Sequence, residues 1–385
     1  MERRRLSKPY RSLLLRLPLL LLLPLGLLVP QLFAGRTAWV EWYAAAVYPV
    51  IRGALATLTG WFRFSLAEWL LYALVLGVPL LLVVQGVRAL LRRLPLHRFL
   101  SLLLSLGITA GALWNLFYAT WGLLYFREPL STRMGLPVEA RSVDELAALT
   151  DLLAAHAVAL REEVEEDGDG VFTADTEAQF AQLPAAYAAL AAADDTFAGT
   201  VTRVKRVTWS TGLSRLGISG IYIGLTAEAN VNVDQPPLLL LHAAAHEMAH
   251  QLGLASEDEA EFTAFLACMR APEPAIRYSA VMHALIRCGN ALHGADAERY
   301  YAIVDARYSD GMRRDLADYN AYWDAFEGPA QEIATDMNDG YLKHNAQVSG
   351  VKSYGESIDM LLALYATGGE KALFVDCGDF RAKFG

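Results

Sequence analysis

Cysteine is scarce in this chain of 385 residues, which has only Cys268, Cys288 and Cys377. No two of them form a C-x-x-C pair, and three cannot build the disulfide framework of a small secreted domain. Cys268 and Cys288 flank a short turn that contains Pro272 and Pro274. A disulfide between these two cysteines is therefore one prediction, and two buried free thiols are the alternative.

An excess of positive charge is also absent, because the formal net charge is −9. A chain with this balance lacks the basic surface on which nucleic-acid binding depends, so we expect no nucleic-acid partner. Internal repeats and low-complexity linkers are missing as well, which excludes a repeat array or a long disordered tether.

Charge is missing altogether from two long runs, at residues 69–87 and 99–126. An earlier apolar run, the first of three along the chain, lies at 17–34; it contains only Gln31 as a polar side chain and follows a basic start. Runs of this length predict transmembrane helices, and a buried core helix is the alternative for each. Trp121, Tyr125 and Phe126 close the third run, as interfacial aromatic residues do. We therefore predict a membrane region over residues 1–126, with the lipid bilayer as a partner.

The first run is also short and rich in leucine, as in a cleaved signal peptide. No clear A-x-A cleavage site follows it, which favours an uncleaved first helix. Basic residues at the N-terminus and between the second and third runs place both segments in the cytoplasm. The sequence then predicts a multi-pass protein of the inner (plasma) membrane, with residues 127–385 on the outer side. Residues 36–67 would form an amphipathic segment lying on the outer membrane surface.

Residues 127–385 predict one mostly helical domain with a small β-element, a fold of the mainly α (α+β) class. Ser142 and Glu145 form a capping box at the start of a helix. A second helix is expected over 176–193, kinked or broken at Pro184. Valine, threonine, tyrosine and isoleucine give strand character to 201–210 and 220–233.

The strongest chemical signal is His246-Glu-Met-Ala-His250, an H-E-x-x-H pattern in an expected helix that ends at Gly253. Helical spacing of i, i+4 places both imidazoles on one face, where they can bind one zinc ion. The carboxylate of Glu247 would then act as the general base of a metal-assisted hydrolase.

A catalytic zinc needs a third protein ligand, with water in the fourth position. Glu257 is favoured, because Glu261 shares its helix face and can accept a hydrogen bond from a ligating histidine. Glu259 is the alternative ligand, although it also fits a capping box with Ser256. His242 lies on the same face as the motif but too far along a straight helix to reach the same ion. The remaining histidines, His283 among them, have no ligand spacing and are interpreted as ordinary residues.

Several stretches of this chain resemble the bacterial membrane proteins grouped as domain-of-unknown-function family 3810. The matching stretches run in order along nearly the whole chain: 64–68, 121–127, 220–222, 226–232, 246–253, 257–260 and 353–355. The resemblance implies a membrane-anchored zinc metallopeptidase, and it makes Tyr354 a candidate oxyanion donor, with a core tyrosine as the alternative. Glu257-Asp-Glu-Ala260 is similar to the third-ligand helix of glutamate-zincins, in which the fourth residue after the ligand is usually Asp or Asn and here is Glu261.

Two functions therefore compete. The leading hypothesis is a Zn²⁺-dependent peptidase that cleaves a peptide or protein substrate outside the cytoplasm. The alternative is a non-catalytic membrane-anchored binding or assembly module with a structural metal. Glu247 distinguishes them, because a structural site has no need of a carboxylate at that position.

Overall fold

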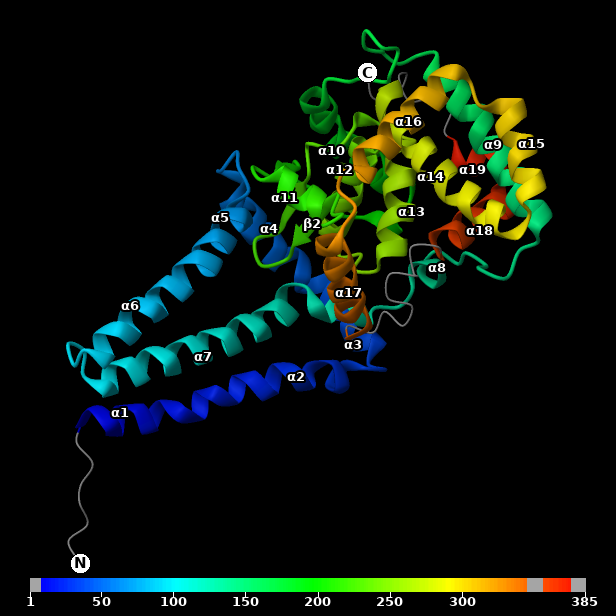
Figure 1. Cartoon of the computed structure of the whole chain (residues 1–385). Helices are drawn as coiled ribbons and strands as arrows, with labels where there is room; N and C mark the ends of the chain where they lie inside the picture. Colours follow the sequence, from blue (N-terminus) through cyan, green and yellow to red (C-terminus); the bar gives the residue numbers. More distant parts are fainter. Residues whose placement is uncertain (1–7, 345–355, 375–385) are drawn as a thin grey trace, which may run out of the picture.

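Apolar helices form an arm that projects from a larger helical part in the computed structural model, which describes residues 8–344 and 356–374 (Figure 1). Three helical stretches are long and apolar enough to cross a membrane: Tyr10–Phe33, Leu66–Leu90 and Leu96–Thr120. Few of their side chains are buried, as expected for surfaces that face lipid. The three apolar helices predicted from the sequence are thus present.

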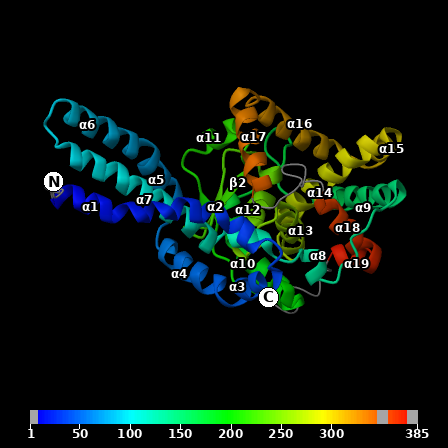
Figure 2. The same ribbon diagram turned by 90° about the horizontal axis from the view of Figure 1, so that it is seen from below.

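The arm is built from consecutive helical segments. They are α1 (Lys8–Arg16), η1 (Leu17–Leu21), α2 (Leu22–Phe33), α5 (Leu66–Tyr72), η2 (Ala73–Gly77), α6 (Val78–Leu90) and α7 (Leu96–Thr120). Helix α2 packs along α7, and α6 returns beside α7 through a short turn (Figures 1 and 2). An added Cβ at Gly111 would lie 2.9 Å from Leu22 Cβ, so this glycine permits the close approach of α7 to α2.

The third apolar helix ends earlier than the apolar run at residues 99–126 predicts. Helix α7 stops at Thr120, and η3 (Gly122–Phe126) enters the larger part of the molecule. Trp121 is 5% exposed and Tyr125 is 9% exposed, because both pack in a buried aromatic cluster. The prediction that these residues form an interfacial belt was wrong, since their apolar surface is covered by protein.

Residues 36–67 form two helices, α3 (Thr37–Ala46) and α4 (Tyr48–Gly60), and not only a surface segment. Their inner faces pack on the rest of the protein: Tyr48 is 2% exposed, and Arg52 donates to Thr200 Oγ1 at 3.0 Å. Their outer faces keep large exposed aromatic side chains, Trp39, Trp42 and, just after α4, Trp61.

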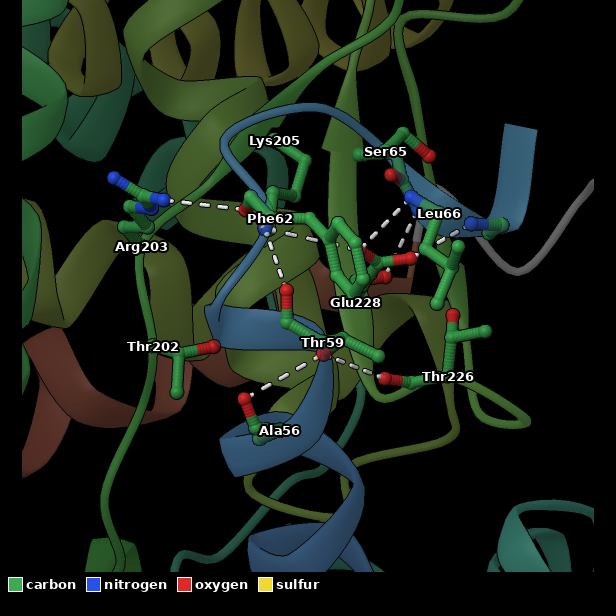
Figure 3. Close-up of polar contacts among 12 residues, drawn as sticks. Ala56, Thr59, Phe62, Ser65, Leu66, Thr202, Arg203, Lys205, Thr226 and Glu228 are labelled. Atoms are coloured by element: carbon green, nitrogen blue, oxygen red, sulfur yellow. Dashed lines mark hydrogen bonds and ion pairs between the residues drawn. The ribbon is translucent and has the colours of Figure 1, made fainter. Parts of the chain in front are cut away.

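Figure 3 shows a buried polar junction between the arm and the larger part. Glu228 accepts from the backbone N–H groups of Leu66 and Ala67, at 3.1 and 2.8 Å, where α5 begins. Lys205 lies 3.8 Å from Glu228 and donates to the carbonyl oxygens of Thr59, at 3.1 Å, and of Phe62. A buried carboxylate needs such partners, so this junction couples the second apolar helix directly to the sheet.

The larger part is mainly helical. Its helices are α8 (Leu130–Arg133), α9 (Val143–Arg161), α10 (Thr176–Ala193), η4 (Asp195–Phe197), α11 (Ser210–Arg215), α12 (Pro237–Gln251), α13 (Glu257–Cys268), α14 (Pro274–Ala295), α15 (Ala297–Arg307), α16 (Asp310–Asp324), α17 (Pro329–His344), α18 (Glu356–Gly368) and α19 (Glu370–Leu373). The capping box of Ser142 and Glu145 is confirmed. Pro184 lies inside α10, which runs unbroken from Thr176 to Ala193, so the predicted break was wrong.

A three-stranded sheet with the order β1-β3-β2 is the β-element of the described residues. The strands are β1 (Lys205–Arg206), β2 (Gly220–Ile223) and β3 (Glu228–Val231). The predicted strand at 220–233 is thus a hairpin, in which Gly220 pairs with Val231 and Ile223 with Glu228. Strand β2 lies at one edge of the sheet, next to α12.

Helix α12 lies in the core, between β3 on one side and α10, α13 and α14 on the others (Figures 1 and 2). Every residue from Leu238 to Gln251 is buried. A helix that is apolar all round except at its histidines, Glu247 and the terminal Gln251 belongs inside a protein, where any polar side chain needs a partner.

Candidate metal centre

Helix α12 brings the two histidines of the motif together on its face toward α13. His246 Nε2 and His250 Nε2 lie 3.1 Å apart. Gly253, with φ +83°, ends the helix and lets the chain turn back into α13. The turn places Glu257, the first residue of α13, beside the imidazoles.

Glu257 completes a set of three ligand atoms. Its Oε2 atom lies 3.0 Å from His246 Nε2 and 3.7 Å from His250 Nε2. Tetrahedral zinc with bonds of about 2.0–2.2 Å would separate its ligand atoms by roughly 3.3–3.5 Å. The three separations scatter around that value, so His246, His250 and Glu257 fit one zinc ion.

The orientation of His250 is fixed by its second nitrogen. Nδ1 lies 2.7 Å from the carbonyl oxygen of Leu254, which can only accept a hydrogen bond. Nδ1 therefore carries the proton, and the lone pair of Nε2 points at the shared position. Carbonyl acceptors hold metal-binding histidines in this tautomer in many proteins.

The charges around His246 favour a cation at this position. Burial lowers the pKa of His246, but Glu261 and Glu257 outweigh it and raise that pKa to about 9. Burial likewise raises the pKa of Glu257, yet its hydrogen bonds with His246 and His250 hold that pKa far below its usual range. Glu257 is thus an ionised carboxylate, as metal coordination requires.

Glu247 is buried on the neighbouring side of α12, against the edge strand. A Cβ at Gly220 of β2 would lie 2.6 Å from Glu247 Cγ, so only glycine leaves room for this carboxylate. Glu247 Oε2 is buried without a hydrogen-bond partner among the described residues. Burial raises the pKa of Glu247 to about 7, against the opposing effect of His246 and His250. A carboxylate with this pKa can accept and return a proton near neutral pH.

Glu259, the alternative third ligand, does not lie with the two histidines of the motif. Its carboxylate accepts from the N–H of Leu130 at 2.6 Å and lies 3.6 Å from Arg133. It belongs to neither of the two metal-ligand groups among the described residues. Ser256 makes no side-chain cap hydrogen bond, so the predicted Ser256–Glu259 capping box was wrong. Glu259 points toward α8 because its carboxylate caps the N-terminus of that short helix.

Glu261 lies less close to the ligating histidine than we predicted. Its Oε1 atom is 3.5 Å from His246 Nδ1, which has no hydrogen-bond partner among the described residues. Its Oε2 atom instead lies 2.8 Å from His242 Nε2 and 3.3 Å from His283 Nδ1. His242 is a neighbour and not a ligand of the first group, as predicted, whereas His283 had no signal in the sequence.

Aromatic residues that the sequence analysis did not assign to the site close one side of it. The Trp121 ring centroid lies 5.5 Å from that of His250 and 4.7 Å from that of Tyr222. The hydroxyl groups of Tyr48 and Tyr222 are 3.1 Å apart. Tyr48 comes from α4 and Trp121 from the end of α7, so segments next to the arm contribute to the wall of the site.

The prediction about the cysteines has a clear outcome. Cys268 and Cys288 are buried free thiols, so the alternative to the disulfide is the one observed. Burial raises the pKa of Cys288 to about 12 and that of Cys268 above it, which keeps both thiols protonated and unreactive. Tyr354, the candidate oxyanion donor, lies outside the described residues.

Comparison with known proteins assigns the chain to a family. The model of the family described as protein of unknown function (DUF3810) matches residues 43–362, so the chain belongs to the DUF3810 family. The match spans α12 and α13 as well as the second and third apolar helices. No curated protein and no solved structure matches the chain.

Proposed function

We propose that this protein is a zinc-dependent peptidase whose site faces the outer side of the membrane. The observation that carries the proposal is the convergence of His246 Nε2, His250 Nε2 and Glu257 Oε2 beside the buried Glu247, whose Oε2 atom has no hydrogen-bond partner among the described residues. Zinc bound by such a donor set supplies a Lewis acid that acidifies water and polarises a carbonyl group.

Glu247 is the general base of the proposed reaction. Its carboxylate takes a proton from the attacking water and then gives it to the leaving amine of the peptide. The pKa of about 7 that burial produces suits both transfers, because the group exchanges protons readily at neutral pH. The proposed oxyanion donor is Tyr354, on the resemblance described above.

Strand β2 is the proposed platform for the substrate. It occupies an edge of the sheet, and its residue Gly220 touches Glu247. An extended peptide that added to this edge would form main-chain hydrogen bonds and pass directly over the carboxylate. Ile221 is 42% exposed, so a side chain of β2 is also open to contact from outside.

The outward orientation rests on the distribution of basic residues. Arg88 lies in the last turn of α6, Arg92 and Arg93 lie in the connection to α7, and Arg98 lies in the first turn of α7, at the same end of the arm as α1 (Figure 1). Cytoplasmic loops are enriched in such residues, which supports the proposal that the opposite end of the arm and the site lie outside. A periplasmic reporter enzyme fused after Gly385 should be active in cells. Activity of a cytoplasmic reporter at that position would reverse the orientation.

Peptide hydrolysis by the full-length protein tests the activity. A library of quenched fluorescent peptides is incubated with the detergent-purified protein, with the protein after chelation, and with the chelated protein after zinc is restored. We expect hydrolysis that chelation abolishes and zinc restores. Glu247→Gln should reduce the rate by about 10²–10⁴-fold while zinc stays bound, because Gln keeps the shape of the base but accepts no proton.

Glu298→Gln on the exposed face of α15 is the matched control and should leave the rate unchanged. Equal rates for Glu247→Gln and the wild type would remove Glu247 as the base. Full function of the Glu247→Gln protein in the cell would replace the peptidase proposal with the binding-module alternative. Proteins that accumulate in cells expressing an inactive variant are the candidate substrates.

A further inference from the structure

A second cluster of metal-binding side chains lies beside the first, at the place where three helices meet. His242 comes from α12, Glu261 from α13 and His283 from α14. Glu261 Oε2 lies 2.8 Å from His242 Nε2 and 3.3 Å from His283 Nδ1, and all three ligand atoms lie within 4.8 Å of one another. Two imidazoles and one carboxylate are the same donor set as His246, His250 and Glu257.

The surroundings of this second cluster bury most of its side-chain surface. The side chains of His242, Glu261 and His283 are 3%, 11% and 17% exposed. They border a small cavity whose remaining polar side chains are Arg287 and Ser357. The other walls of the cavity are apolar and are formed by Phe262, Phe265, Ala284, Ile358 and Leu361. His242 Nδ1 is buried without a hydrogen-bond partner among the described residues.

Glu261 contacts both clusters, but its shorter contacts are with the second. It makes a hydrogen bond with His242, whereas His246 Nδ1, at 3.5 Å from the other oxygen, has no hydrogen bond. A carboxylate that served only to orient His246 would be expected at hydrogen-bond distance from its Nδ1 atom. The observed position of Glu261 fits a ligand whose partners are His242 and His283.

We propose that His242, Glu261 and His283 bind a second divalent metal ion, of the zinc type that imidazole and carboxylate ligands accept. The adjoining cavity offers room for a water molecule as a fourth ligand. Among the residues that the structure describes, no counterpart of Glu247 and no strand edge borders this cavity. The second ion is therefore structural, and it cross-links α12, α13 and α14 behind the first site.

Counting bound zinc tests the proposal on the full-length protein in detergent. The protein is stripped with a chelator, reloaded with zinc alone, freed of excess ion and analysed by mass spectrometry for zinc per chain. His283→Asn places an amide nitrogen near the position of Nδ1, and His242→Gln does the same for Nε2. Each amide can still donate a hydrogen bond to Glu261 but is a poor zinc ligand, so each variant should bind one ion fewer than the wild type.

His293→Asn is the matched control, since His293 is an exposed histidine of the same helix as His283, and it should bind as many ions as the wild type. An unchanged zinc count in both His283→Asn and His242→Gln would overturn the proposal. Melting curves of the zinc-free proteins identify any variant that fails to fold, and the other variant then decides. The count is independent of hydrolysis, so an inactive protein can still carry the second ion.

Discussion

Two clusters with the same donor set lie one helical turn apart on α12, and their neighbours differ. The first, His246, His250 and Glu257, has Glu247 and the edge of β2 beside it. The second cluster of His242, Glu261 and His283 is enclosed by side chains of α13, α14 and α18. Ligand chemistry alone therefore cannot tell a catalytic site from a structural one. The difference lies in Glu247 and the edge of β2, the proposed base and substrate platform, which among the described residues lie beside the first cluster and do not line the cavity of the second.

The connection to the membrane also differs between the clusters. Residues of the segments next to the arm, Tyr48 and Trp121, pack around the first. Glu228 begins β3, and it accepts from the start of α5 (Figure 3). The first cluster thus lies on the side of the domain that is tied to the apolar helices, whereas the second is bordered by side chains of α13, α14 and α18.

Removing one histidine from each cluster should give the largest difference. His246→Ala should weaken zinc binding at the first cluster by more than the 10–100-fold that outer-shell changes cost, because two protein ligands remain. His242→Ala, one turn earlier, should weaken zinc binding at the first cluster by about tenfold or less. Zinc titration against a chromophoric chelator measures both. Equal losses at the first cluster would mean that the clusters do not bind separately.

Gly220→Ala should displace Glu247, the proposed base, and leave zinc binding at the first cluster intact. The new Cβ would lie 2.6 Å from Glu247 Cγ, so the carboxylate has to move. A displacement of about 1 Å can cost roughly 100-fold in rate, and we expect a loss of that order in peptide hydrolysis with normal zinc content. Gly294→Ala, at a position where an added Cβ meets nothing within 4 Å, is the control. Normal hydrolysis by Gly220→Ala would argue against the role of Glu247.

Zinc binding at the first cluster should weaken as the pH falls. Burial lowers the pKa of His246, yet Glu261 and Glu257 raise it to about 9 in the metal-free protein. Below that pH the histidine must lose a proton before it can bind zinc, so affinity should fall by about tenfold from pH 8 to pH 7. Titrations on His283→Asn, which isolates the first cluster, measure this slope. An affinity that does not change over this range would contradict the assigned protonation of His246.

Glu259→Gln should have the smallest effect. Gln can still accept from the N–H of Leu130 but loses its charge interaction with Arg133, so we expect a loss of roughly 1 kcal/mol in the free energy of unfolding. Zinc content at both clusters should be normal. Loss of zinc in this variant would return Glu259 to the ligand set.

The sequence predicts those features that depend on local spacing. The three apolar helices, the capping box of Ser142 and the placement of His246 and His250 follow from runs and periods along the chain. The second cluster could not be predicted in this way, because His283 stands 41 positions after His242 and reaches it only through the packing of α14 on α12.

The errors have the same origin. Trp121 has the composition of an interfacial residue, but its ring is covered by Tyr222 and His250 from distant parts of the chain. Glu259 has the spacing of a capping partner for Ser256, yet its carboxylate accepts a hydrogen bond from the backbone N–H of Leu130 instead. In both cases a long-range contact outweighs a local preference.

Locating zinc in the full-length protein tests the central claim most directly. A structure of the zinc-loaded protein, with an anomalous difference map at the zinc absorption edge, gives the position of every bound ion. The account predicts a peak at about 2.0–2.2 Å from His246 Nε2, His250 Nε2 and a carboxylate oxygen of Glu257. The absence of a peak among these three side chains, or a peak ligated by Glu259 in place of Glu257, would contradict it.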